Sequence, residues 1–383
     1  MTWHIENSIP VTQPYLPPLT EFLPYLEKIW DNAWLTNNGP FHRQLEEELA
    51  RYLGINHLSL FTNGTLALIT ALQALNIGGE VITTPYSFVA TSHSLIWNNI
   101  TPIFADIDPI TLNINPEKIE ALITEKTTAI LAVHVYGNPC DTKSIQNIAE
   151  KHNLRVIYDA AHAFNIRHNE EPILRAGDLS ILSFHATKVF NTFEGGAIVC
   201  HDTETKNHID QLKNFGLVDE ITMVQPGINA KMSEIQAAFG LLQLQYISDA
   251  IEKRKLIHNR YLDELSNIPG LRLPQWPNSV SNNYGYFPIF ITDEFPIKRD
   301  DLYNKFREYN IFARRYFFPL ISNFAPYHNH PSSQIENLPI ANAIADQVLC
   351  IPIYPTLSEE NQSLIISIIK DAATSCSMTE VKS

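Results

Sequence analysis

Between residues 57 and 199, short apolar runs alternate with longer segments whose apolar residues recur at helical spacing. The short runs predict buried strands, and the longer segments predict helices that pack one face against those strands. The predicted strands span residues 57–61, 80–83, 101–106, 128–135, 155–159, 179–184 and 194–199. The predicted helices span residues 66–75, 87–98, 116–123 and 143–152. This alternation is typical of an α/β fold with a mostly parallel central sheet covered on both faces.

The regions on either side of this alternation have a different pattern. Residues 9–18 are rich in proline, which keeps a helix from starting before about Thr20. Amphipathic helices are predicted next at residues 22–34 and 41–53, and another helix at residues 232–245. Beyond this last helix we expect helices at residues 251–265, 298–309 and 358–372, and strands at 284–291 and 347–353. The chain therefore divides into a large domain, 1–245, and a smaller α+β domain, 246–383.

Charge and hydropathy exclude several classes of partner. The chain has 383 residues, of which 45% are hydrophobic, and a formal net charge of −14. The negative charge disfavours nucleic acid or an anionic membrane as the main partner. The longest apolar runs, such as 128–135, are too short to cross a membrane. Residues 1–10 lack a basic segment followed by an apolar one, so we expect no secretion signal.

The cysteines and histidines predict neither disulfides nor a metal site. The four cysteines lie far apart with no CxxC pair, and they are Cys140, Cys200, Cys350 and Cys376. This pattern fits a reducing cytoplasm. His328 and His330 are closely spaced in an irregular segment, but no third ligand is apparent, so no metal is expected.

The first candidate for ligand chemistry is Thr62-Asn63-Gly64-Thr65, which joins the strand 57–61 directly to the helix 66–75. A helix start of this kind exposes free backbone N–H groups at the positive end of the helix dipole. The stretch therefore suits a phosphate group. The alternative is an ordinary capped helix, because Thr and Asn are common N-caps.

The second candidate is Asp159, which follows the buried strand 155–159 and precedes Ala160-Ala161-His162. A buried carboxylate needs a partner, because an unpaired buried charge is costly. A helix cap would provide one. A protonated heterocyclic nitrogen would provide another, and pyridoxal phosphate requires a carboxylate at that position. His162 could pack against the same ring, or it could be a structural histidine with its own hydrogen bonds.

The third candidate is Lys188, in the sequence Ser183-Phe184-His185-Ala186-Thr187-Lys188 between two apolar strands. A lysine in a cleft has a lowered pKa and a nucleophilic amine, which is what Schiff-base formation with an aldehyde cofactor needs. Gly195 and Gly196 allow the backbone to pass close to a bulky group. The alternative is a solvent-exposed lysine in a hairpin-like loop.

Seven motifs together resemble the DegT/DnrJ/EryC1/StrS family of sugar aminotransferases, in the aspartate aminotransferase superfamily of fold type I. The resemblance runs from about Ile9 to Pro355. The motifs are Asn63-Gly64-Thr65-Leu66-Ala67-Leu68, Pro85-Tyr86-Ser87-Phe88-Val89-Ala90-Thr91, Val133-His134-Val135-Tyr136-Gly137, Asp159-Ala160-Ala161-His162-Ala163, Ser183-Phe184-His185-Ala186-Thr187-Lys188, Glu194-Gly195-Gly196-Ala197 and the stretch from Gly227 to Ala238. Each motif alone is weak, and their shared order makes the signal specific.

The resemblance implies a role for each matched residue. Lys188 would hold pyridoxal 5'-phosphate as a Schiff base and shuttle a proton, Asp159 would pair with the pyridine nitrogen, and His162 would lie beside the ring. Phe88 would stack on one ring face. The phosphate would be held by the backbone amides of Gly64 and Thr65, by the hydroxyl of Ser183, and by Asn229 of the neighbouring subunit, which implies a homodimer. His185 and Lys231 would contact the nucleotide sugar.

The resemblance also implies a reaction. Glutamate would donate an amino group to a keto-deoxysugar linked to a nucleotide, and His-x-Thr-Lys followed by Glu-Gly-Gly favours dTDP-4-keto-6-deoxyglucose and amination at C4, for O-antigen or related amino-sugar synthesis. A sugar dehydratase of the family has histidine at the position of Lys188, so transamination is favoured here. The alternatives are a 3-keto or a UDP- or GDP-linked substrate, and a non-catalytic regulatory protein that retains the cofactor.

Two details limit these assignments. Lys231 stands where many relatives have arginine, and the two cations bind phosphate differently. Arg314, Arg315 and Tyr316 either face the sugar nucleotide or form a solvated turn, and they are not assigned to the catalytic set.

Overall fold

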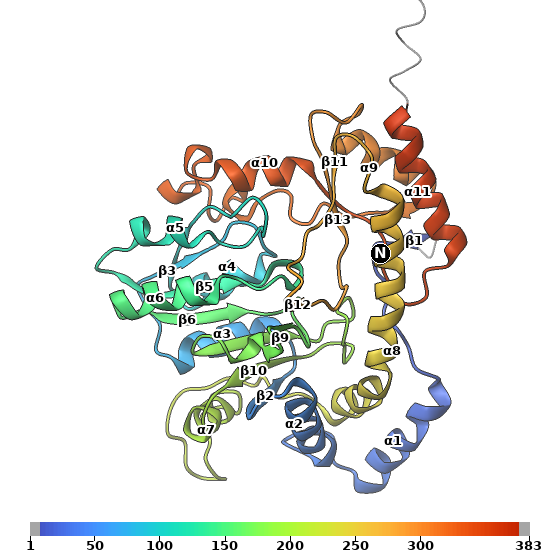
Figure 1. The fold of residues 1–383 in the computed structure, drawn as a ribbon. Helices are drawn as coiled ribbons and strands as arrows, with labels where there is room; N and C mark the ends of the chain where they lie inside the picture. The colour runs from blue at the N-terminus through green and yellow to red at the C-terminus, as the bar shows by residue number, and fades with distance from the viewer. Residues whose placement is uncertain (1–7, 375–383) are drawn as a thin grey trace, which may run out of the picture.

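The computed structural model describes residues 8–374. Residues 1–7 and Cys376 therefore lie outside the described part, as does most of the segment on which we based the expectation of no secretion signal. Figure 1 shows a large α/β part that contains the first two thirds of the chain and a second part, beside it, built from the last third.

The large part is organised around a seven-stranded sheet with the strand order β2-β10-β9-β6-β5-β3-β4. Its strands are β2 (His57–Phe61), β3 (Glu80–Thr83), β4 (Thr101–Phe104), β5 (Thr127–Val133), β6 (Arg155–Asp159), β9 (Leu179–Ser183) and β10 (Gly196–Cys200). Only β10 runs antiparallel to its neighbours within this sheet. The prediction of a mostly parallel α/β sheet is therefore confirmed.

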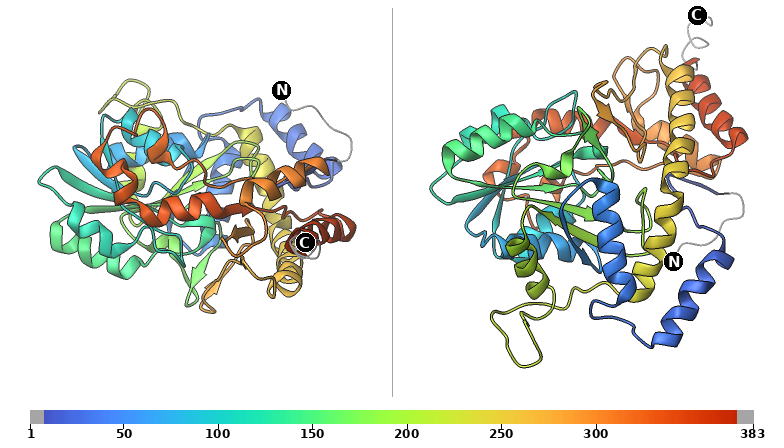
Figure 2. Two further views of the ribbon diagram at one scale, coloured as in Figure 1. Left: turned by 90° about the horizontal axis from the view of Figure 1, so that it is seen from above. Right: turned by 60° about the horizontal axis from the view of Figure 1, so that its bottom comes forward.

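Helices cover both faces of this sheet, because neighbouring strand residues point to opposite sides. Ile157 packs with α3, α4 and α7, whereas Val156 and Tyr158 pack with α5 and α6. The helices are α2 (Pro40–Leu53), α3 (Gly64–Ala74), α4 (Ala90–Trp97), α5 (Pro116–Ile119), α6 (Thr142–His152) and α7 (Thr203–Leu212). Figure 2 shows the helices above and below the sheet. The predicted elements are recovered within a few residues at their ends, and α7 was not predicted.

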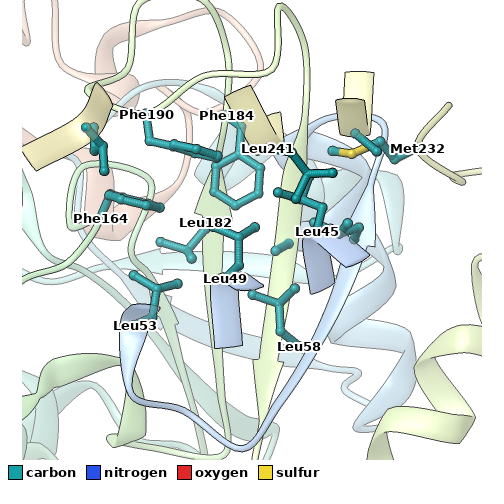
Figure 3. Packing of buried hydrophobic residues seen from close by; sticks show 14 of the residues in the cluster. Leu45, Leu49, Leu53, Leu58, Phe164, Leu182, Phe184, Phe190, Met232 and Leu241 are labelled. Atoms are coloured by element: carbon teal, nitrogen blue, oxygen red, sulfur yellow. The ribbon is translucent and has the colours of Figure 1, made fainter. Parts of the chain in front are cut away.

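A third apolar cluster holds α1 (Leu19–Asn32) and α2 against the β2 edge of the sheet. Figure 3 shows leucines of α2 in one cluster with Phe184, which directly follows β9, and with Phe164 and Phe190. Leu45 and Leu49 are completely buried there. Replacing either by alanine would cost about 2–5 kcal/mol of folding free energy. This cluster fixes β9 and β10, and with them the loop that carries Lys188.

One long helix, α8 (Glu234–Leu265), links the two parts of the chain (Figure 1). The prediction of two separate helices at residues 232–245 and 251–265 is wrong. No proline or glycine lies between them, so nothing in the backbone ends the first helix. The first half of α8 packs in the cluster of Leu45, and the second half packs on the C-terminal part through Ile257, Tyr261 and Leu265. The boundary at 245/246 falls inside this helix, and the division into two domains stays a prediction.

The C-terminal part is built around a three-stranded antiparallel sheet, β11-β13-β15. Its strands are β11 (Leu271–Arg272), β13 (Pro288–Ile291) and β15 (Val348–Cys350), and its helices are α9 (Arg299–Glu308), α10 (Pro339–Gln347) and α11 (Glu359–Thr374). Strand β1 (Ile9–Pro10) pairs with β14 (Ile311–Phe312), so the start of the described chain joins its last third. A further small sheet contains β7 (Arg167–His168), β8 (Glu171–Pro172) and β12 (Val280–Ser281).

The short strands β1, β7, β8, β11, β12 and β14 were not predicted, because two-residue strands carry no periodicity. The helix α10 was not predicted either. No helix within residues 8–374 is both long and apolar enough to cross a membrane.

Candidate active site

A cavity of about 900 Å³ opens at the carboxyl ends of the central strands. Ligands of parallel α/β sheets bind at this edge, because loops that follow the strands meet there. Nine of the ten residues predicted for the site line this cavity, namely Gly64, Thr65, Phe88, Asp159, His162, Ser183, His185, Lys188 and Asn229. Lys231 does not line it. The opposite wall comes from the C-terminal part and includes Tyr286, Tyr316 and Phe317.

The start of α3 is shaped to receive an anion. Asn63 caps the helix, and its Oδ1 accepts a hydrogen bond of 2.8 Å from the backbone N–H of Leu66. The first N–H groups of a helix have no acceptor within it, so those of Gly64 and its neighbour are left for a ligand. A Cβ on Gly64 would lie 3.1 Å from Cβ of Ser183, and one on Gly196 would lie 2.7 Å from the nitrogen of Gly64. Both glycines therefore allow the helix start and the ends of β9 and β10 to meet.

Asp159 ends β6 as a buried carboxylate. Its Oδ2 accepts a hydrogen bond of 2.7 Å from the Thr91 hydroxyl, and its Oδ1 accepts one of 3.1 Å from the backbone N–H of Ala161. Burial raises the pKa of Asp159 above its usual value, although these two hydrogen bonds and the charge of Lys188 act in the opposite direction. A cation placed against this carboxylate would stabilise its ionised form, and a protonated ring nitrogen is such a cation.

Lys188 lies in the same cavity, half-buried, in the loop between β9 and β10. Its Nζ is 3.2 Å from the hydroxyl of Tyr286. Burial lowers the pKa of Lys188 to about 8, against the opposing influence of Asp159 and Tyr316. The pKa of this amine is therefore close to neutral pH, so the amine can gain and lose a proton readily. A nucleophile that also acts as an acid–base group needs this property.

His162 is buried between aromatic rings next to this lysine. Its Nδ1 accepts a hydrogen bond of 3.2 Å from the backbone N–H of Tyr136. Its ring is nearly parallel to that of Phe317, with centroids 5.8 Å apart, and meets the ring of Tyr286 at 4.8 Å. Burial, and then the charge of Lys188, lowers the pKa of His162 well below its usual value. The ring is therefore neutral, with the proton on Nε2.

Phe88 lines the cavity with 60% of its surface exposed. The helix predicted for residues 87–98 begins only at Ala90, so Phe88 belongs to the preceding loop. The hydroxyls of Ser87 and Thr91, 2.9 Å apart, tie this loop to the first turn of α4. A large free aromatic face at a cavity wall is suited to stacking on a planar ligand.

The residues predicted for the nucleotide sugar lie in different places. Nε2 of His185 is 3.5 Å from the carboxylate of Glu194, and both side chains line the cavity. Lys231 instead donates a hydrogen bond of 2.9 Å to Asn214, and its Nζ lies 4.8 Å from the ring centre of Phe215. Asn229 lines the cavity of its own chain, and its predicted action on a neighbouring subunit stays a prediction.

The sequence did not single out the aromatic wall. Tyr286 falls in the predicted strand 284–291, but β13 begins at Pro288, and this leaves Tyr286 in the loop that reaches Lys188. Tyr316 was considered, and it lines the cavity, whereas Arg315 forms an ion pair with Asp300. Thr91, which bonds Asp159, is the last residue of the motif that begins at Pro85. Its position one helical turn after Ser87 is the sequence feature that could have indicated its role.

The histidines outside the cavity make local contacts. His328 lies 3.0 Å from the carbonyl oxygen of Ala325, and His330 accepts a hydrogen bond from the backbone N–H of Ser332. Residues 8–374 contain no group of three or more His, Cys, Asp or Glu side chains arranged to hold a metal ion.

Comparison with known proteins places the chain in one family. The profile of the DegT/DnrJ/EryC1/StrS aminotransferase family matches residues 19–370. A dTDP-4-amino-4,6-dideoxy-D-glucose transaminase of Escherichia coli is 53% identical over 366 residues, which cover 95% of this chain and 98% of that protein. The crystal structure of DesI in the presence of its TDP-sugar product is 32% identical, with a TM-score of 0.92 over 98% of this chain and 96% of that chain.

A third relative bears on the cofactor. The structure of NtdA from Bacillus subtilis with its bound cofactor PMP is 28% identical, with a TM-score of 0.84 over 93% of this chain and 82% of that chain. The cavity fits this type of cofactor, since the helix start at Gly64, the buried carboxylate of Asp159 and the amine of Lys188 line the same cavity. The chain belongs to the DegT/DnrJ/EryC1/StrS aminotransferase family and is an enzyme that depends on pyridoxal 5'-phosphate.

Proposed function

We propose that the enzyme transfers the amino group of glutamate to C4 of dTDP-4-keto-6-deoxyglucose. This proposal rests on the 53% identity, over nearly the whole of both chains, to a transaminase that is named for the corresponding amino sugar. In the balanced reaction glutamate becomes 2-oxoglutarate, and the ketone oxygen of the sugar is replaced by the amino group. The product would serve the synthesis of a surface polysaccharide such as O-antigen.

The side chains would divide the work between binding and proton transfer. The backbone N–H groups of Gly64 and Thr65 and the Ser183 hydroxyl would bind the cofactor phosphate. Asp159 would hold the proton on the pyridine nitrogen, and Phe88 would fix the plane of the ring. When bound, the cofactor supplies an aldehyde that accepts the amino group and a ring that delocalises electrons.

Lys188 would carry out the proton transfer at the substrate carbon. Its pKa of about 8 leaves a substantial fraction of the amine unprotonated near neutral pH, and general acid–base groups act best with a pKa near the working pH. The neutral His162 would lie beside the ring without adding charge. His185, with Glu194 behind it, would face the sugar nucleotide.

The substrate assignment is tested by supplying the purified enzyme with glutamate and dTDP-4-keto-6-deoxyglucose. We expect 2-oxoglutarate and a dTDP-linked 4-amino sugar in equimolar amounts, identified by NMR. If glutamate is consumed only with the 3-keto isomer or with UDP- or GDP-linked sugars, the sugar assignment is wrong and the aminotransferase assignment stands. If no sugar tested is aminated and no amino acid is consumed, a regulatory protein that only retains the cofactor becomes the better explanation.

We also propose that two copies of the chain form the working enzyme. Large apolar side chains stand exposed at Trp97, which lines the cavity, and in the loop between α7 and α8, and a second copy of the chain would cover them. They include Trp97 at 79%, Ile221 at 94%, Met223 at 66% and Val224 at 56% exposure. In such a dimer Asn229 would bind the phosphate of the partner's site.

Mixing two inactive variants tests this arrangement. Lys188→Ala and Asn229→Ala subunits are unfolded together and refolded as a mixture. If Asn229 acts across the interface, each mixed dimer gains one site with both residues, and activity rises above that of either variant. If Asn229 acts within its own chain, mixing restores nothing. Sedimentation analysis of the same samples reports whether dimers form.

A further inference from the structure

Two buried tyrosines of the large part lie behind the aromatic wall of the active-site cavity, which is formed by Tyr286, Tyr316 and Phe317. Tyr86 follows β3 and Tyr136 follows β5, and they are 0% and 2% exposed. Neither of these two tyrosines lines the cavity, whereas the three residues of the wall do. Any part that they play in the reaction therefore acts through the wall.

The hydroxyls of both tyrosines meet the backbone carbonyl oxygen of Tyr316. Tyr136 donates a hydrogen bond to this oxygen, and the hydroxyl of Tyr86 lies 3.1 Å from it and 2.7 Å from the hydroxyl of Tyr136. Each hydroxyl has one proton to donate, so Tyr86 donates to the carbonyl oxygen or to the Tyr136 hydroxyl. Burial raises the pKa of both tyrosines above the usual value, so both hydroxyls remain donors at neutral pH.

The rings of the same two tyrosines pack on the wall. The ring of Tyr136 is nearly parallel to that of Phe317, with centroids 6.1 Å apart, and the ring of Tyr86 meets that of Phe317 edge-on at 5.6 Å. The ring of Tyr136 also lies 5.4 Å from that of Tyr286. Tyr136 therefore contacts all three residues of the wall, by its hydroxyl or by its ring.

Residues 314–321 carry two of the three rings of the wall, and this segment is bonded to the rest of the chain at both ends. Arg314 exchanges backbone hydrogen bonds of 3.0 and 2.7 Å with Cys350. The backbone N–H of Ile321 donates one of 3.0 Å to the carbonyl oxygen of Pro85. The tyrosine hydroxyls bond the segment between these two ends, where it reaches the cavity.

The backbone of Tyr136 has a conformation that is costly to maintain. Its φ is +55°, in the left-handed region that bulky residues rarely adopt. Residues held in such conformations concentrate at functional sites, where the surrounding structure keeps them in place. We propose that Tyr136, assisted by Tyr86, is a positioning residue that holds residues 314–321 in place and keeps the aromatic wall packed against Lys188.

This role would control the protonation of Lys188. Burial has the largest influence on the pKa of Lys188 and lowers it to about 8, while Asp159 and Tyr316 act in the opposite direction. The hydroxyl of Tyr286 and the neutral ring of His162 also lie beside the amine. Water that enters behind a loosened wall would favour the charged amine, so the pKa of Lys188 would rise toward its usual value.

Tyr136→Phe tests the proposal, because it removes the hydroxyl and retains the ring. The rate at which the apoenzyme captures pyridoxal phosphate is measured against pH, and amide hydrogen exchange of residues 314–321 is followed by mass spectrometry. Loss of one ordinary hydrogen bond changes an equilibrium by about threefold to tenfold, so exchange should accelerate by about that factor. The midpoint of the capture profile should rise by about half a pH unit, and further in the double variant Tyr86→Phe, Tyr136→Phe.

Tyr261→Phe is the matched control. The hydroxyl of Tyr261 is also buried, and it donates a hydrogen bond of 2.9 Å to the carbonyl oxygen of Pro352. The control loses the same kind of bond, so it should lose stability to a similar degree with the capture midpoint and the exchange of residues 314–321 unchanged. Equal changes in this control would overturn the proposal, as would a double variant whose midpoint or exchange stays at the wild-type value.

The proposal rests on the proposed role of Lys188 as the amine that captures the cofactor. Lys188→Ala tests that role separately, because its apoenzyme should not capture pyridoxal phosphate. If capture persists in Lys188→Ala, the role of Lys188 in the proposed function is wrong. The exchange rates of residues 314–321 then decide by themselves whether the two tyrosines hold the wall.

Discussion

The two walls of the large cavity differ in origin and in chemistry. The sheet wall carries the polar groups at the ends of β2, β6 and β9, which are Gly64, Thr65, Asp159, Ser183 and Lys188. The aromatic wall consists of Tyr286, Tyr316 and Phe317, which come from loops of the C-terminal part. The sheet wall supplies N–H groups, a carboxylate and an amine. The aromatic wall packs against Lys188 and His162 and contributes to their burial.

This difference explains the electrostatics of the site. The dominant cause of the shifted pKa is burial for Asp159, His162 and Lys188 alike. The sheet wall therefore provides the reactive groups, and their reactivity depends on the environment that the aromatic wall completes. Substitutions in the sheet wall should lower the rate of the reaction, and substitutions in the aromatic wall should shift the pH dependence of the reactive groups.

The largest effect is expected for Lys188→Ala. Loss of the group that moves the proton should lower kcat by about 10⁴-fold, the upper range for a positioned acid–base group. The formation of 2-oxoglutarate from glutamate in the presence of dTDP-4-keto-6-deoxyglucose measures this loss of kcat. Lys143→Ala, at an exposed position on α6, serves as the control and should retain full activity. Turnover within tenfold of the wild type in Lys188→Ala would show that another group performs this step.

Asp159→Asn should have the next largest effect. An amide of the same shape cannot keep the ring nitrogen protonated, and losing a charged hydrogen bond of about 3 kcal/mol lowers kcat roughly a hundredfold. Steady-state kinetics with saturating cofactor measure the change, with the exposed Asp263→Asn on α8 as the control. A loss that added cofactor fully restores would instead indicate a role in binding alone.

Tyr286→Phe sharpens the comparison, because it belongs to the aromatic wall and contacts Lys188. Only the neutral amine of Lys188 attacks the aldehyde of pyridoxal phosphate. The rate at which the apoenzyme captures the cofactor should therefore rise about tenfold per pH unit up to about pH 8, the pKa of Lys188, and stay constant above it. The Tyr286 hydroxyl accepts from the Lys188 amine, so its removal disfavours the ammonium and lowers the pKa by roughly half to one unit.

The midpoint of this capture profile should therefore move to lower pH in Tyr286→Phe. Tyr52→Phe, whose hydroxyl lies near Ser248 and which does not line the cavity, is the control and should leave the profile unchanged. A midpoint that stays in place or rises in Tyr286→Phe would mean that this hydroxyl does not hold the amine.

The smallest effect is expected for Lys231→Ala. Its amine is already engaged by Asn214 and the ring of Phe215, so KM for the nucleotide sugar should change by less than about threefold, which corresponds to under 1 kcal/mol. His185→Ala, within the cavity, should raise KM more. If KM for the nucleotide sugar instead rises about tenfold or more in Lys231→Ala, Lys231 contacts the substrate, as the sequence predicted.

The sequence predicted the sheet wall because parallel strands order their ends along one edge. Each polar group follows its strand directly in the chain, as Asp159 follows β6 and Ser183 ends β9. The seven motifs then indicated the family and the cofactor, which the comparisons confirmed. The roles of the individual residues stay predictions that the variants above would test.

The sequence by itself determined the alternating α/β order, the acidic balance of the chain and the place of Lys188 between two strands, since these depend on local spacing and composition. Only the tertiary structure decided that α8 is continuous, that β1 joins the last third of the chain, and that Tyr286 reaches Lys188. The physical reason is separation along the chain. Contacts such as that between residues 188 and 286 arise from packing two distant parts together, and no local periodicity records them.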